Sequence, residues 1–129
     1  MSGLHVLVVE DEPNVQKLIC LVLKKSGFVA TAVGDGEDAL RLLMNEGLRP
    51  ALVLLDVVMP KVDGITVLKA IRSHPEMNGM PVILLLALSG NSAQLQGAAT
   101  LATDCLAKPF QPNDLIARVQ AVLAKSVAA

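Results

Sequence analysis

Aromatic residues are almost absent from this sequence: it holds two phenylalanines, Phe28 and Phe110, and no tryptophan or tyrosine. A chain without stacking side chains has no platform for single-stranded nucleic acid. Positive charge is not in excess either, because 11 Lys and Arg face 12 Asp and Glu, for a formal net charge of -1. Proteins that bind a phosphate backbone need a positive surface. We therefore expect no direct nucleic-acid partner.

Cysteine is equally scarce. Cys20 and Cys105 stand far apart in the chain, and only two histidines accompany them. This spacing contains no CxxC pair, which argues against a zinc site and against a disulfide framework. We expect both thiols to act as small apolar side chains.

No segment has the pattern of a secretion signal or a membrane span. The apolar run Leu4 to Val9 is short, follows no basic region and ends in acids. The longest stretch without charge, Met77 to Thr103, is interrupted by Pro81, Gly90 and Gly97, whereas a spanning helix needs about 20 consecutive apolar residues. We expect a soluble, cytoplasmic protein with no membrane partner.

Apolar sequence, by contrast, is abundant. With 129 residues, 53% hydrophobic and 18% charged, the chain has the size and composition of one globular domain, placed at residues 1–129. Short apolar runs rich in β-branched residues predict strands that are buried on both faces of a parallel sheet. These runs are Val6–Val9, Phe28–Val33, Ala51–Leu55, Val82–Leu86 and Cys105–Ala107.

Segments of helical period separate the predicted strands. Glu12, Asp35 and Asp63 each stand just before such a segment, where a carboxylate can accept a hydrogen bond from the first turn of a helix. Pro112 is placed to begin the last helix. The remaining segment, Ser92 to Leu101, has the weakest pattern because it carries no charge and contains a glycine.

Strand and helix thus alternate five times, which predicts a parallel sheet with helices on both faces. The common five-stranded solution is a flavodoxin-like (βα)5 doubly wound α/β fold with strand order 2-1-3-4-5. In that order the winding reverses between the first and third strands. Ligands bind at this reversal, outside the carboxyl ends of the strands.

Acidic side chains gather at the predicted reversal. Glu10 and Asp11 follow the first strand, and Asp56 follows the third. No glycine-rich or hydroxyl-rich phosphate loop accompanies them, and crowded carboxylates favour a hard cation such as Mg²⁺. Lys108, after the fifth strand, adds an ammonium group at the same edge. Carboxylates, Mg²⁺ and a lysine together indicate phosphoryl transfer to a carboxylate.

The chain resembles the receiver domain of two-component response regulators over essentially its whole length. The resemblance rests on segments in the family's order: Val8 to Glu12, Leu54 to Pro60 with Asp63-Gly64, Pro81 to Ile83, and Lys108 to Phe110. It implies a phosphoacceptor rather than an enzyme. A histidine kinase or phosphotransfer protein would supply the phosphoryl group.

The resemblance also implies a role for each site residue. Asp56 matches the phosphoacceptor and a metal ligand. Asp11 matches a direct Mg²⁺ ligand, Glu10 a ligand acting mostly through water, and Val58 a ligand through its backbone carbonyl. Lys108 matches the residue that contacts the phosphoryl group, and the peptide bond that follows it is implied to be cis.

Two positions depart from the family pattern. Leu86 stands where the family has Thr or Ser, whose hydroxyl contacts the phosphoryl group, and Cys105 stands where it has Tyr or Phe. In the family these residues couple phosphorylation to the face made by the fourth helix, the fifth strand and the fifth helix. We expect a downstream protein to bind that face, and the chain to be a monomer or a weak dimer.

These departures leave a second function open, that of a degenerate receiver acting as a phosphorylation-independent interaction module. A small phosphatase fits less well, since its aspartyl nucleophile would follow the first strand. Flavin binding is weaker still, because the crevice is acidic where a phosphate would sit. The chain is expected to be either a stand-alone receiver or a piece of a longer regulator.

Overall fold

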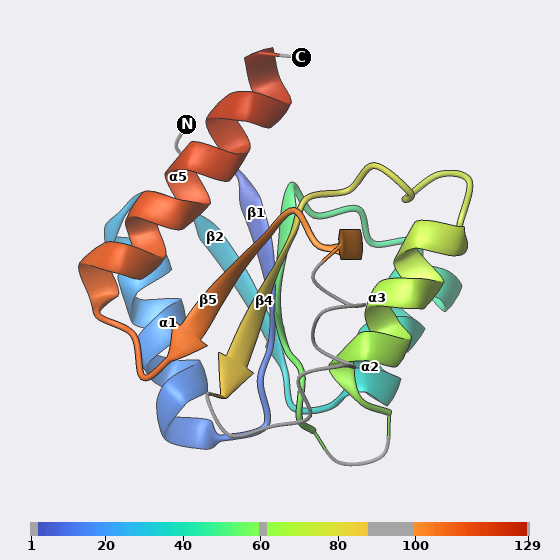
Figure 1. The fold of residues 1–129 in the computed structure, drawn as a ribbon, viewed down its shortest axis with the longest axis horizontal. Coiled ribbons are helices and arrows are strands. Elements are labelled where there is room, and N and C mark those ends of the chain that lie inside the picture. Colours follow the sequence, from blue (N-terminus) through green and yellow to red (C-terminus); the bar gives the residue numbers. More distant parts are fainter. Residues whose placement is uncertain (1–2, 60–61, 88–99, 129) are drawn as a thin grey trace.

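The computed structural model describes residues 3–59, 62–87 and 100–128. Strands and helices alternate along the chain (Figure 1). In order they are β1 (His5–Val9), α1 (Pro13–Lys25), β2 (Val29–Val33), α2 (Gly36–Leu40), the π-helical segment η1 (Arg41–Asn45), β3 (Leu52–Asp56), α3 (Gly64–Ser73), β4 (Val82–Ala87), β5 (Asp104–Lys108) and α5 (Pro112–Ala128). Most of the helix predicted from Ser92 to Leu101 lies outside the described residues, of which Thr100 and Leu101 are helical.

The strands form a five-stranded parallel sheet in the order β2-β1-β3-β4-β5. This confirms the predicted flavodoxin-like fold and its strand order. The inner strands β1 and β3 are buried over nearly their whole length, whereas β2, at one edge, mixes exposed and half-buried residues. Near the carboxyl edge Val9 pairs with Leu55, and Asp56 pairs with Leu85. The register therefore brings the ends of β1 and β3 to one edge of the sheet.

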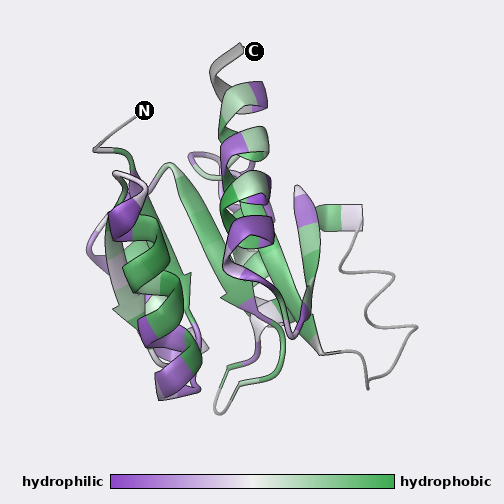
Figure 2. Cartoon of the chain, turned by 90° about the vertical axis from the view of Figure 1, so that its left-hand side faces the viewer, coloured by the Kyte–Doolittle hydropathy of each residue, from purple (hydrophilic) through white to green (hydrophobic). Residues whose placement is uncertain are grey.

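Helices cover both faces of this sheet (Figure 1). Alternate strand residues such as Val8, Leu54 and Ile83 pack with α1 and α5, and their neighbours such as Leu55 and Leu84 pack with α2 and α3. Such alternation follows from the two-residue period of a strand. Figure 2 shows the strands mostly hydrophobic, while α1 and α5 mix hydrophilic and hydrophobic residues. Within the described residues, no helix is long and apolar enough to cross a membrane.

The local signals for helix ends are confirmed. The carboxylates of Glu12, Asp35 and Asp63 each accept a backbone N–H from the helix that follows, at 2.8, 2.8 and 2.9 Å. Such caps satisfy N–H groups that have no partner within the helix. The second helix was not fully predicted, because its last turn widens into η1.

A guanidinium group joins α3 to the chain before β4 and before β5. Arg72 Nε donates to the Leu101 carbonyl at 2.7 Å. Its Nη1 donates to the carbonyls of Met80 and Asn78 at 2.7 and 3.2 Å, and its Nη2 lies 3.4 Å from Thr103 Oγ1. Arg72 thereby fixes the end of α3 against both segments.

Candidate functional site

The carboxyl ends of β1 and β3 bring the predicted acids together. Asp56 is the last residue of β3, and Glu10 is the first residue after β1. Both side chains are buried, with residue exposures of 5% and 0%, whereas Asp11 is exposed. A carboxylate oxygen from each of the three lies within 4.8 Å of those of the other two. The predicted acidic cluster is therefore present.

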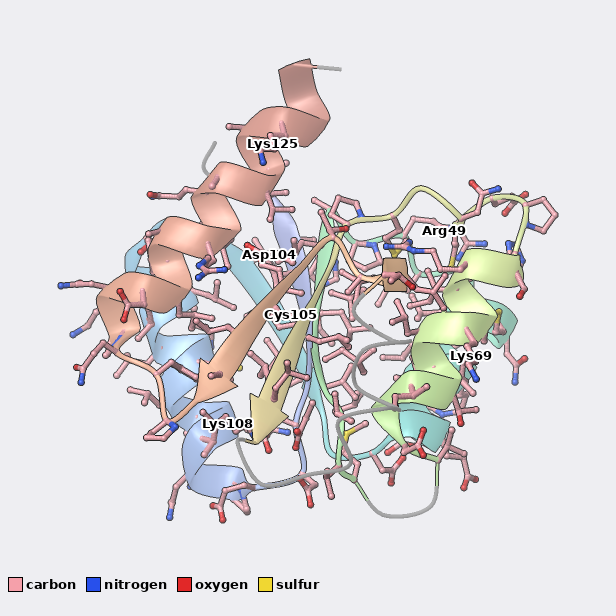
Figure 3. The ribbon with its side chains drawn as sticks, viewed as in Figure 1. Arg49, Lys69, Asp104, Cys105, Lys108 and Lys125 are labelled. Carbon is pink, nitrogen blue, oxygen red and sulfur yellow. The ribbon has the colours of Figure 1, made fainter. Side chains whose placement is uncertain are left out.

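Lys108 reaches the same cluster from the end of β5. Its Nζ lies 2.6 Å from Glu10 Oε1 and 3.2 Å from Asp56 Oδ2. Figure 3 shows Asp104, Cys105 and Lys108 in order along β5, with Lys108 at the strand's carboxyl end. Among the described residues, the Lys108 ammonium is the hydrogen-bond donor that faces the buried Glu10 Oε1, which has no other one. A buried carboxylate oxygen needs such a partner, because burial without one is costly. As the resemblance implied, the bond between Lys108 and Pro109 is cis.

The cluster shifts the protonation of its members. The pKa of Asp56 is raised to about 7, first by burial and then by the charge of Glu10, with Lys108 acting in the opposite direction. Burial lowers the pKa of Lys108, but the hydrogen bond to Glu10 and the charge of Asp56 outweigh it, and the net pKa lies above its usual value. The acids thus hold more negative charge than one ammonium offsets, so a cation placed among them would be stabilised.

The residues of the cluster fit Mg²⁺. All three side chains offer carboxylate oxygens, the ligands that Mg²⁺ prefers, and their spacing allows one ion to meet them. Asp11 is exposed, and Val58, the predicted carbonyl ligand, is 69% exposed. This side of the site is therefore open to the waters and phosphate oxygens with which Mg²⁺ completes its coordination.

Gly64 has a role at the site that sequence reasoning missed. The Asp63-Gly64 pair predicted the start of a helix and formed part of the family pattern, with no role at the site. In the structure a Cβ on Gly64 would lie 2.1 Å from the Asp56 carbonyl oxygen, and Gly64 N donates to the Val57 carbonyl at 2.9 Å. A side chain at this position would displace the backbone that carries Asp56. The close approach joins two elements, so the sequence holds no local signal for it.

The two departing positions lie within an apolar region. Leu86 and Cys105 are both half-buried and pack against the core cluster beneath α2 and α3. Burial raises the pKa of the Cys105 thiol, and the charge of Asp104 adds to the shift, so the thiol stays neutral near pH 7. Neither residue carries the chemistry that the family has at its position.

Asp56 and Lys108 belong to one face of the sheet, and the departing pair belongs to the other. Asp56 continues the alternation of Leu54, and Lys108 continues that of Leu106, whose side chains face α1 and α5. Leu86 and Cys105 belong to the cluster on the other face. The strand period therefore places the side chains of Asp56 and Lys108 on one face and the departing pair on the other, while Leu86 follows Leu85, the partner of Asp56 in the sheet.

Comparison with known proteins agrees with this geometry. Residues 6–120 match the family model described as the response regulator receiver domain. The chain is 36% identical over 122 residues to the DNA-binding response regulator MtrA of Mycolicibacterium smegmatis, an alignment covering 95% of this chain and 51% of that protein. The chain thus spans about half the length of the curated relatives it matches.

Solved structures share the fold. The receiver domain of a signal transduction histidine kinase from Syntrophus aciditrophicus superposes with a TM-score of 0.86 at 29% identity, covering 95% of this chain and 92% of that one. The receiver domain of the Francisella response regulator 1452 gives a TM-score of 0.82 at 30% identity, covering 96% and 99%. The strand order, the acidic cluster and these matches agree: the chain belongs to the response regulator receiver domains of two-component signalling.

Proposed function

We propose that this receiver domain accepts a phosphoryl group on Asp56 in a Mg²⁺-dependent reaction. The donor is a phosphohistidine of a histidine kinase or a phosphotransfer protein in the cytoplasm. The observation that carries the proposal is the buried Asp56 carboxylate, with Glu10 and Asp11 oxygens within 4.8 Å and the Lys108 ammonium at 3.2 Å. Output follows through protein contacts on the face formed by β5, α5 and the segment before β5.

The residues supply the parts that phosphoryl transfer to a carboxylate requires. An Asp56 carboxylate oxygen attacks the phosphorus, and a P–O bond forms as the P–N bond of the phosphohistidine breaks. The histidine nitrogen leaves with the bonding electron pair. Lys108 remains beside Asp56 and offsets negative charge on the transferred group.

The metal ligands in this proposal are Asp11, Asp56 and the Val58 carbonyl, with Glu10 acting mostly through water. When bound, Mg²⁺ neutralises charge on the phosphoryl oxygens and holds them close to the acceptor. Glu10 also pairs with Lys108, and this pair orients the ammonium toward Asp56.

The test is the intact mass of the chain after incubation with acetyl phosphate. We expect a gain of one phosphoryl group that requires Mg²⁺ and disappears in Asp56→Ala. The matched control is Asp114→Ala, which removes an exposed carboxylate in the first turn of α5 and leaves the gain intact. No gain in the wild-type chain while Mg²⁺ still binds would contradict the phosphoacceptor role.

A second candidate is a phosphorylation-independent interaction module, which the apolar residues Leu86 and Cys105 favour. Amide hydrogen exchange of the chain with and without phosphorylation at Asp56 distinguishes the two. A switch changes exchange in β5 and α5, whereas a module changes it only around the acids. The comparison needs no identified partner.

A further inference from the structure

Glu10 is held through every polar group that it has. Its N–H donates to the Val33 carbonyl at 3.1 Å, and its carbonyl accepts from Gln16 Nε2 at 2.9 Å. One carboxylate oxygen, Oε1, faces Lys108 Nζ at 2.6 Å, and the other, Oε2, accepts from Glu12 N at 3.1 Å. Among these partners the Gln16 side chain has no place in the proposed phosphoryl chemistry, so its contact needs a separate explanation.

Gln16 joins the ends of two strands. Its Nε2 donates to the Glu10 carbonyl and also to the Val33 carbonyl, at 2.9 and 3.1 Å. The amide has two N–H donors, and these two contacts use both. The paired register of β1 and β2 ends at Val9 and Val33. Gln16 therefore adds two hydrogen bonds just past the last paired residues, beside the backbone bond from Glu10 N–H to the Val33 carbonyl.

We propose that Gln16 is a positioning residue for the Mg²⁺ site, an inference that rests on the proposed function. The Glu10 carbonyl belongs to the peptide unit that leads into Asp11. A fixed carbonyl therefore fixes where the exposed Asp11 side chain starts. The three carboxylates repel one another without a cation, and this repulsion favours outward movement of Asp11. Gln16 opposes that movement, so the ligands are already placed when the ion arrives.

The chemistry of glutamine suits this task. A neutral amide donates to two carbonyls without adding positive charge beside a cation site. A lysine at this position would repel Mg²⁺. A glutamate would place its carboxylate oxygens against the two carbonyl oxygens and donate no hydrogen bond to them. The restraint comes from hydrogen bonds alone.

Calorimetric titration of the metal-free chain with MgCl₂ tests the proposal. Gln16→Met keeps the length of the side chain and removes both donors. We expect it to weaken Mg²⁺ binding about 10-fold, the lower end of the range for partners that orient metal ligands. Gln16→Ala, which truncates the side chain, is expected to act in the same direction. Amide exchange at Asp11 in the metal-free chain is expected to rise in both variants.

Two controls separate positioning from general stability. Gln120→Met makes the same replacement at an exposed site on α5, and Ile19→Val removes a buried methyl group from α1 without touching either carbonyl. Both are expected to bind Mg²⁺ as the wild type does. Equal affinity in the Gln16 variants, or an equal loss in Ile19→Val, would overturn the role of Gln16. A wild-type chain that binds no Mg²⁺ would overturn the metal dependence of the proposed function together with it.

Discussion

The acidic end of the sheet and the departing pair on β4 and β5 differ in kind. At the acidic end Glu10, Asp56 and Lys108 are charged groups held in direct contact. At the other position Leu86 and Cys105 are apolar and pack into the core on the α2 and α3 side. Asp56 and Lys108 thus lie on the alternation that faces α1 and α5, whereas Leu86 and Cys105 pack on the other face. The acidic end can therefore match the residues of the family pattern while positions 86 and 105 depart from it.

The largest effect is expected from Lys108→Met, which removes the ammonium from the acidic end. Glu10 Oε1 loses its ion-pair partner, and the phosphoryl group loses a compensating charge. We expect the rate of phosphorylation by acetyl phosphate to fall about 100-fold, the scale for one electrostatic group at a reacting centre. Intact mass against time measures the rate. Lys125→Met, on the exposed side of α5, is the matched control, and a rate within twofold of wild type in Lys108→Met would contradict the prediction.

A smaller effect is expected from pH on the free energy of unfolding of the metal-free chain. The folded-state pKa of Asp56 is raised to about 7, whereas an unfolded aspartate titrates near 3.9. The folded chain therefore binds the proton more tightly. The stability that this gives is fully present below about pH 4 and is lost as the pH rises through about 7. Urea unfolding in EDTA is expected to show a falling free energy from pH 5 to pH 8.

Asp56→Asn checks the source of this slope, because asparagine does not titrate. We expect the variant to flatten the pH dependence, and added Mg²⁺ to restabilise the wild type most at pH 8, where Asp56 is charged. An unchanged slope in Asp56→Asn would assign the effect to other groups.

The smallest effect is expected from Leu86→Thr, which places a hydroxyl in the apolar region around Leu86 and Cys105 and changes the extent of phosphorylation. Leu86 follows Leu85, the partner of Asp56 in the sheet, and the family resemblance implies that a hydroxyl at this position contacts the phosphoryl group. One such hydrogen bond contributes about 1 kcal/mol, so the equilibrium with acetyl phosphate should shift about 5-fold toward the phosphorylated chain. Leu86→Val has the shape of threonine without the hydroxyl and is the matched control. Equal phosphorylation in the two variants would show that the hydroxyl does not reach the phosphoryl group.

The parts of the molecule that depend on local sequence were predictable. Strand positions followed from apolar runs, and the caps at Glu12 and Asp63 followed from carboxylates before helical segments. Convergence of Glu10 and Asp56 followed from the strand order, since both end inner parallel strands. The strands and caps are set by a few neighbouring residues, and the convergence needs only the strand order in addition.

The features that were missed depend on distances between elements. Gln16 looked like any polar residue on a helix, and its two carbonyl partners are fixed only once α1 lies across the ends of β1 and β2. The contact of Gly64 with the Asp56 backbone has the same origin. The residues of η1, Arg41–Asn45, are all compatible with an ordinary α-helix, so no signal in the sequence marked the widened turn.

Arg72 has a mechanical consequence for how this domain can rearrange. Its guanidinium holds carbonyls from the segment before β4 and from the segment before β5 at the end of α3. Sliding of either segment along α3 would break hydrogen bonds to this group, and rotation would weaken them, because a planar guanidinium fixes the directions of its N–H donors. Arg72 therefore ties the chain before β5 to the end of α3 and resists its displacement.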